Sequence, residues 1–222
     1  MYDYLVAHLK GGPLNQVTND FLTPDVTGLT LCHLSDLKTQ PFIDRFESIL
    51  GIISSSELEF KQSKVFKPNK IQEEDLSQRK SNVAFIEDEN LDRILFSLVQ
   101  EANYNARWNL NLHSVYPVQY GVYENNDFYG WHCDQNIEFD PNVDTSVKKI
   151  SLTLFLNDPS EYEGGEFDIE IHAPYKNPRY DTLKLPKGSI IIFRSDRWHR
   201  VRPVTSGVRK SLVTWFRGPP FR

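Results

Sequence analysis

The sequence predicts a mainly β fold with flanking helices: a double-stranded β-helix (jelly-roll) core supported by an N-terminal helical buttress. From about residue 115 onward, short segments rich in β-branched and aromatic residues alternate with turn signals. Two earlier segments carry apolar residues at helical spacing. The chain has 222 residues, of which 39% are hydrophobic, enough for a sizeable core. We therefore expect one domain over residues 1–222, with a helical support region at 1–108 and the jelly-roll core at 115–218.

Two helices are expected in the first part of the chain. Residues 39–41 (Thr-Gln-Pro) can start one, because proline suits the first helical turn, and Gly51 is available to end it. The second runs from about Asn90 to Arg107, and acidic residues at its start suit the positive end of the helix dipole. Each helix has an apolar stripe, which we expect to pack on the outer face of one sheet.

The second part of the chain contains the strands. Eight strands at this spacing are typical of a jelly roll or a double-sheet barrel. The expected strands are Val115–Tyr123, Phe128–Asp134, Lys149–Asn157, Glu166–His172, Thr182–Leu185, Ser189–Arg194, His199–Arg202 and Arg209–Phe216.

Three connecting segments have features of their own. Lys61–Asn82 is polar and carries both charge signs, which favours a solvated loop or ragged edge strands over a mobile flap. Glu138–Asp144 is expected to be a solvent loop, with a lid as the alternative. Gly164 and Gly165 indicate a tight turn in which side chains would clash.

Composition and charge exclude several classes of protein. The net charge of -5 disfavours nucleic-acid binding, and no apolar run approaches the roughly 20 residues that span a bilayer. The first residues lack the pattern of a signal peptide. Cys32 and Cys133 are the only cysteines, which excludes a disulfide scaffold and makes a cytoplasmic location the simplest expectation.

The residues that point to chemistry are His132, Asp134 and His199. On an extended strand, His132 and Asp134 point to the same face, whereas Cys133 points away. Two imidazoles and one carboxylate form the facial triad of non-haem Fe(II) oxygenases. A structural hydrogen-bonding trio and a zinc site are the alternatives.

Arg209 is the second candidate. If the strands His199–Arg202 and Arg209–Phe216 are neighbours around a tight turn, Arg209 reaches the barrel interior near the metal. A buried arginine needs an anion, and its planar fork matches a carboxylate. A dicarboxylate co-substrate fits this arrangement, and the Tyr123 hydroxyl can add a hydrogen bond to it. The alternatives are a surface salt bridge for Arg209 and a packing role for Tyr123.

Four segments resemble a known family, the Fe(II)- and 2-oxoglutarate-dependent dioxygenases. The resemblance is to the prolyl-4-hydroxylase-like group, including its bacterial PKHD-type members, and it covers about residues 115–218. The two histidines, the aspartate, the glycine pair and the arginine occur in matching order. The segments are Tyr123–Asp134, Glu163–Phe167, Lys187–Phe193 and His199–Leu212.

This resemblance implies a role for each matching residue. It makes His132, Asp134 and His199 the catalytic iron ligands, and Arg209, assisted by Tyr123, the partner of the C5 carboxylate of 2-oxoglutarate. Trp215 and Tyr129 are expected on the substrate side. The cofactors implied are Fe(II), 2-oxoglutarate as co-substrate and O2, with ascorbate as a candidate reductant.

The function expected from the resemblance is hydroxylation of an amino-acid side chain, with release of succinate and CO2. Peptidyl proline at C4 is the leading substrate, so a proline-containing protein or peptide is the expected partner. One alternative keeps this chemistry on a free amino acid, another small molecule or a nucleobase. The other alternative is a cupin-like sensor that binds metal or ligand without catalysis.

Overall fold

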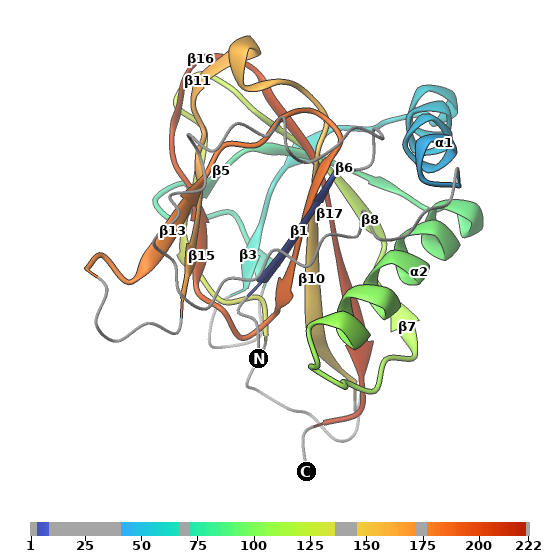
Figure 1. The fold of residues 1–222 in the computed structure, drawn as a ribbon. Helices are drawn as coiled ribbons and strands as arrows, with labels where there is room; N and C mark the ends of the chain where they lie inside the picture. The colour runs from blue at the N-terminus through green and yellow to red at the C-terminus, as the bar shows by residue number, and fades with distance from the viewer. Residues whose placement is uncertain (1–3, 9–40, 67–71, 136–145, 172–176, 221–222) are drawn as a thin grey trace.

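Two antiparallel β-sheets form the framework of the protein (Figure 1). The structure, a computed structural model, describes residues 4–8, 41–66, 72–135, 146–171 and 177–220. Within these ranges, two helices lie on the outer face of the larger sheet. From β8 onward the chain passes back and forth between the two sheets, which is the jelly-roll arrangement. The fold class expected from the sequence is therefore confirmed.

The strands of the two sheets come from distant parts of the chain. The eight-stranded sheet has the order β1 (Tyr4–His8), β14 (Ser189–Arg194), β10 (Val147–Phe155), β17 (Arg209–Gly218), β8 (Val118–Tyr123), β6 (Asn82–Ile86) and β2 (Lys61–Gln62), with β7 (Ser114–Val115) paired to β17. The five-stranded sheet has the order β13 (Tyr180–Leu183), β12 (Phe167–Glu170), β15 (His199–Val201), β9 (Phe128–His132) and β5 (Arg79–Lys80). Two short pairs complete the described strands: β11 (Tyr162–Gly164) with β16 (Val204–Gly207), and β3 (Val65–Phe66) with β4 (Gln72–Glu73).

The helices are α1 (Pro41–Ser55) and α2 (Glu89–Asn105), close to the expected positions. Asp88 caps α2, because its carboxylate accepts hydrogen bonds of 2.9 Å from the backbone N–H groups of Asn90 and Leu91. The apolar stripes of both helices pack on the large sheet, as expected. This core cluster includes Phe46, Leu95, Leu152, Ile192 and Phe216.

The expectation that Gly51 ends the first helix is wrong, because α1 continues to Ser55. Gly51 lies on the exposed side of the helix, and Ile52 and Ile53 beyond it pack against the core. A glycine inside a helix costs about 1 kcal/mol relative to alanine. Burying parts of two isoleucine side chains, at about 0.8 kcal/mol per CH2 group, outweighs this cost.

The eight expected strands are all present, but some limits differ. The first is split into β7 and β8 around Pro117, which has no N–H to donate to a neighbouring strand. The strand expected to end at Asp134 ends at His132. Strands β1 and β6, which were not expected, pair with β14 and β8 of the large sheet.

The two strands that carry His199 and Arg209 are not neighbours, so that expectation is also wrong. Strand β16 forms between them and pairs with β11, so β15 joins the small sheet and β17 the large one. The Gly164–Gly165 turn permits this pairing, because a Cβ atom at Gly164 would collide with the Pro203 carbonyl group. Both glycines have positive φ, 70° and 65°, as the expected tight turn requires.

The described parts of the segment Lys61–Asn82, residues 61–66 and 72–82, contain ragged edge strands, one of the two expected forms. They are not simply solvated, because Ser63, Arg79 and Ser81 are buried. The segment Glu138–Asp144 lies outside the described residues. Neither of the two described helices has the length and apolar character needed to cross a membrane.

We expect Leu95→Ala to lower the free energy of unfolding by about 2–5 kcal/mol, because Leu95 is fully buried between α2 and the large sheet. Urea denaturation measures this change. Tyr104→Ala, on the same helix, is the matched control: its side chain is 78% exposed, and we expect a change within about 0.5 kcal/mol. Equal losses in both variants would contradict the packing of α2 described above.

Candidate functional site

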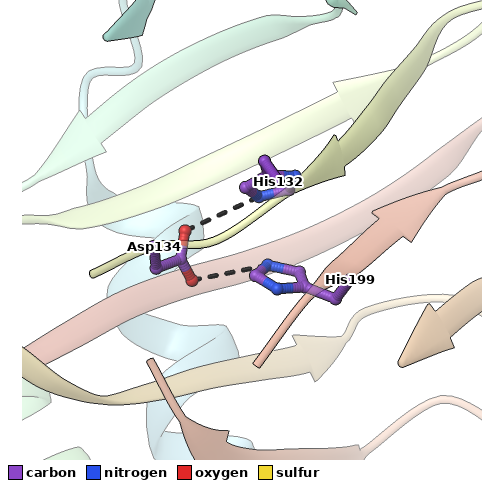
Figure 2. Close-up of side chains that lie close together, drawn as sticks. All are labelled: His132, Asp134 and His199. Carbon is purple, nitrogen blue, oxygen red and sulfur yellow. Dashed lines mark ion pairs between the residues drawn. The ribbon is translucent and has the colours of Figure 1, made fainter. Parts of the chain in front are cut away.

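His132, Asp134 and His199 come together between the two sheets (Figure 2). His132 ends β9 and His199 begins β15, and the antiparallel pairing of these strands sets the two residues opposite each other. Asp134 follows β9 in a bend. One side-chain donor atom from each of the three residues lies within 4.8 Å of the others. Among the described residues this is the only such cluster of three or more potential metal ligands.

Backbone carbonyl groups orient both imidazole rings. Nδ1 of His132 lies 2.9 Å from the carbonyl oxygen of Gly130, and Nδ1 of His199 lies 2.9 Å from that of Arg197. A carbonyl oxygen only accepts, so each Nδ1 carries the proton in the neutral ring, and the lone pair lies on Nε2. The Nε2 atoms of His132 and His199 lie 3.6 and 3.4 Å from the Asp134 carboxylate. Two nitrogen donors and one oxygen donor therefore converge on one point.

The carboxylate of Asp134 is held by a buried hydroxyl pair. Ser151 Oγ donates to Asp134 Oδ2 at 2.7 Å, and Ser195 Oγ lies 2.9 Å from Ser151 Oγ. Both serines are fully buried. Neither serine is apparent from the sequence, because a single serine on a strand (Ser151) or in a turn (Ser195) carries no recognisable signal.

The protonation states of His199 and Asp134 suit metal binding. Burial, followed by the nearby ring of His132, lowers the pKa of His199 to about 4, so this ring is neutral at pH 7. Burial by itself would raise the pKa of Asp134, but the adjacent rings of His199 and His132 outweigh it and hold the pKa well below its ordinary value. The cluster therefore presents a neutral His199 imidazole beside the Asp134 carboxylate.

Arg209 lies in the interior, as expected. It comes from the large sheet, however, and not from a strand beside the one that carries His199. It starts β17 on the inner face of the large sheet and is only 1% exposed. Its guanidinium lies 5.4 Å from the ring centroid of Tyr123 and 5.1 Å from that of Phe155. Nη1 donates to Ser211 Oγ at 3.1 Å, but Nε and Nη2 are buried without a hydrogen-bond partner.

The unpaired N–H groups of Arg209 indicate a missing anion. Buried polar groups are nearly always hydrogen-bonded, and a buried guanidinium is costly without an anion. A cavity of about 30 Å³ is lined by Arg209, Tyr123, Trp215 and the three cluster residues. The buried Trp215 Nε1 atom also has no partner. Gly165 allows this packing, because a Cβ atom there would lie 3.0 Å from Arg209 Cδ.

A second, larger pocket, here called the outer pocket, opens from the cluster and has a volume of about 770 Å³. Trp215 and Tyr129, expected on the substrate side, both line it. Tyr129 stacks on the His132 ring with centroids 3.5 Å apart. The outer pocket is also lined by Arg79 and Lys148, which sequence analysis missed because isolated basic residues resemble those of any solvated surface.

Cys133 lies between two cluster residues but outside the cluster, as expected, although β9 ends at His132 and strand alternation is therefore not the reason. It is half-buried, and it lines the outer pocket. Its thiol donates to the carbonyl oxygen of Ser195 at 3.1 Å, and burial raises its pKa. The thiol is therefore protonated at pH 7 and a poor ligand.

Comparison with known proteins agrees with this geometry. The 2OG-Fe(II) oxygenase superfamily matches residues 118–217, which include the three cluster residues and Arg209. A PKHD-type hydroxylase of Aliarcobacter butzleri is 37% identical over 143 residues, covering 61% of this chain and 60% of the relative. Another, from Teredinibacter turnerae, is 38% identical over 101 residues, covering 46% of this chain and 42% of the relative. The chain thus spans about half the length of these relatives.

Solved structures share the fold at low sequence identity. The viral collagen prolyl hydroxylase of Paramecium Bursaria Chlorella virus-1, in a 2OG complex, has a TM-score of 0.51 at 20% identity, covering 64% of this chain and 80% of its own. A Trichoplax adhaerens prolyl hydroxylase, in complex with a hypoxia inducible factor peptide fragment, has a TM-score of 0.52 at 16% identity, covering 78% of this chain and 76% of its own.

Residues 118–217 belong to the 2OG-Fe(II) oxygenase superfamily. Within that superfamily the chain is similar to the PKHD-type hydroxylases, as its sequence motifs indicated. The residues present fit the groups that the superfamily name implies. The two imidazoles and the carboxylate suit Fe(II), and Arg209 with two unpaired N–H groups suits a carboxylate of 2-oxoglutarate (2OG).

We expect Ser151→Ala to weaken metal binding roughly 10- to 100-fold, the usual effect of removing a hydrogen bond that orients a ligand. The variant loses the hydroxyl that donates to Asp134 Oδ2. Calorimetric titration with Co(II) measures the affinity. Ser206→Ala, at an exposed serine, is the control and should bind as the unmodified protein does. Unchanged affinity in Ser151→Ala would show that the hydroxyl does not orient the carboxylate.

Proposed function

We propose that this chain is an Fe(II)- and 2-oxoglutarate-dependent dioxygenase that hydroxylates an amino-acid side chain and releases succinate and CO2. One observation carries the proposal. The buried Arg209, with two unpaired N–H groups, lines the same cavity as His132, Asp134 and His199. If the three residues were only a structural hydrogen-bonding trio, the protein would not need the buried Arg209 guanidinium, with its unpaired N–H groups, beside them.

In this proposal, His132 and His199 hold Fe(II) through Nε2, and Asp134 holds it through its carboxylate. Bound Fe(II) with 2OG supplies the O2 chemistry of this class, in which 2OG loses CO2 and the substrate gains a hydroxyl group. The protein keeps the His199 ring neutral and orients both rings through the carbonyl groups of Gly130 and Arg197.

Arg209 would bind the carboxylate of 2OG that lies away from the metal, because a five-carbon dicarboxylate can extend from the cluster toward it. The ring faces of Tyr123 and Phe155 fix the guanidinium in place. The Tyr123 hydroxyl is proposed to assist. Phe167 and Phe193 pack against the His199 ring, with ring centroids 5.5 and 4.7 Å away, and exclude water from that side.

Peptidyl proline is the proposed substrate, with the outer pocket as its binding site. Support comes from the PKHD-type names of the sequence relatives. In addition, the outer pocket is large, and Tyr129 and Trp215 provide aromatic surface in it. Proline rings pack well on such surfaces, and Trp215 connects the outer pocket to the inner cavity. A proline-containing protein or peptide is then the partner, and ascorbate a candidate reductant.

We expect Arg209→Gln to raise the dissociation constant for 2OG about 10- to 100-fold, because it removes a charge-assisted pair. Anaerobic titration of the Fe(II)-loaded protein, followed through the visible charge-transfer band, measures the constant. His199→Ala should abolish the band. Lys210→Gln, at the exposed neighbour of Arg209 on β17, is the control and should titrate normally.

A folded, iron-loaded protein that shows no band would contradict the dioxygenase proposal and favour a metal- or ligand-binding sensor. An equal effect of Arg209→Gln and Lys210→Gln would remove Arg209 from the 2OG site. The urea midpoints of all variants separate these results from unfolding.

We expect a panel of proline-containing peptides to yield a product with one added oxygen atom and one succinate for each hydroxylation. Mass spectrometry of the peptides and a succinate assay measure the two products. Succinate formation without any hydroxylated peptide would reject the prolyl substrate but keep the dioxygenase chemistry. A free amino acid or another small molecule would then be the substrate.

A further inference from the structure

The outer pocket contains two cationic side chains that no carboxylate neutralises within the described part of the chain. Arg79 is buried, and it donates only to neutral oxygen atoms, Oγ of Ser81 at 3.2 Å and Oε1 of Gln119 at 3.3 Å. The ammonium group of Lys148 makes no hydrogen bond or ion pair with a described residue. Its contacts are the faces of two aromatic rings, Trp215 at 3.7 Å and Tyr116 at 5.3 Å.

Both cations lie where the outer pocket meets the inner cavity. Arg79 and Trp215 line both spaces, and so does His132. Lys148 lies on the ring of Trp215, and Arg79 lies 4.5 Å from the ring centroid of Tyr129, which stacks on His132. A molecule that reaches the cluster from the outer pocket therefore passes close to both positive charges.

The charges of the surrounding residues leave this position positive. Besides Asp134, the carboxylates that line the outer pocket are those of Asp75 and Glu87, and Asp75 already accepts two hydrogen bonds from Ser77. Lys61 and Lys64 add positive charge at the pocket wall. In the proposed function, the Asp134 carboxylate is a metal ligand and is not the partner of these cations.

Keeping Lys148 charged at this place is costly. Burial lowers its pKa to about 8; the charge of Asp134 opposes this shift, whereas Arg217 and Arg79 add to it. A desolvated ammonium group that faces aromatic rings is stabilised most by an anion. The anion cannot be the far carboxylate of 2OG if that carboxylate pairs with Arg209 in the inner cavity.

We propose that the substrate carries a carboxylate next to the residue that is hydroxylated, and that Lys148, with Arg79 beside it, binds this carboxylate. The inference rests on the proposed function and narrows its substrate class to acidic peptide segments. Lys148 acts as a specificity residue, because its ammonium group favours an aspartate over an asparagine neighbour.

Two fluorescent peptide libraries test the proposal. Each library has a central proline and random residues at the outer positions. In one library the residues directly before and after the proline are Asp, and in the other they are Asn. Fluorescence anisotropy with the Co(II)- and 2OG-loaded protein measures binding. We expect the Asp library to bind about tenfold more tightly, the usual contribution of one charge-assisted hydrogen bond.

Two variants assign the preference to Lys148. Lys148→Gln should bring both libraries to the same affinity, and Lys148→Arg should keep most of the preference. Lys64→Gln is the control, because Lys64 lines the same pocket but is exposed, and it should retain the tenfold difference. Binding of 2OG in the absence of peptide should be the same in all of these proteins.

Several outcomes would overturn the proposal: no binding of the Asp library, equal binding of both libraries to the unmodified protein, or a preference that survives Lys148→Gln. Weaker 2OG binding in Lys148→Gln would assign Lys148 to the co-substrate site instead. Failure of the prolyl proposal looks different: the Asp preference and its loss in Lys148→Gln remain, but neither library is hydroxylated.

Discussion

The pairing of β9 with β15 in the small sheet is the constraint on which the site depends. It sets His132 opposite His199, and the chain beyond β9 then turns so that Asp134 faces both rings. Side chains alternate between the two faces of a strand. His199 and Val201 therefore face the interior, and Arg200 and Arg202 face the opposite side. A shift of β15 by one residue would replace His199 at the site with Trp198 or Arg200, depending on its direction.

The outer face of the small sheet holds that register. Asp168 on β12 is fully buried and accepts hydrogen bonds from Nε of Arg200 at 2.7 Å and Nε of Arg202 at 2.9 Å. Thr182 on β13 donates to the same carboxylate at 2.7 Å. Removing Asp168 would leave two arginines without their anion, so this charge cluster ties three strands together in one alignment.

The two faces of the large sheet differ: one packs against the helices, and the other carries residues of the site. Its outer face is covered by α1 and α2 and is mainly apolar at the contact, whereas its inner face carries Arg209, Ser151 and Trp215 among apolar neighbours. Helical packing on one face gives β10 and β17 a rigid support. The polar groups on the other face are then held in fixed positions, which is what a site that orders a metal and an anion requires.

Local sequence determined much of this protein. Most strands of the second half, the α2 helix with its acidic start, the glycine turn and the residue types of the candidate site are all apparent from short segments. Their physical signals are local: side-chain periodicity, turn conformation and the donor atoms of His-x-Asp.

Only the tertiary structure decided the rest, because those features depend on which segments meet. Arg209 enters the interior from the sheet opposite His199, since β16 separates their strands; spacing along the chain cannot show this. Gly51 is tolerated inside α1 because Ile52 and Ile53, which follow it, pack against the hydrophobic core. Arg79, Lys148, Ser151 and Ser195 reach the site from distant segments, and their significance comes from burial and neighbours that no local pattern encodes.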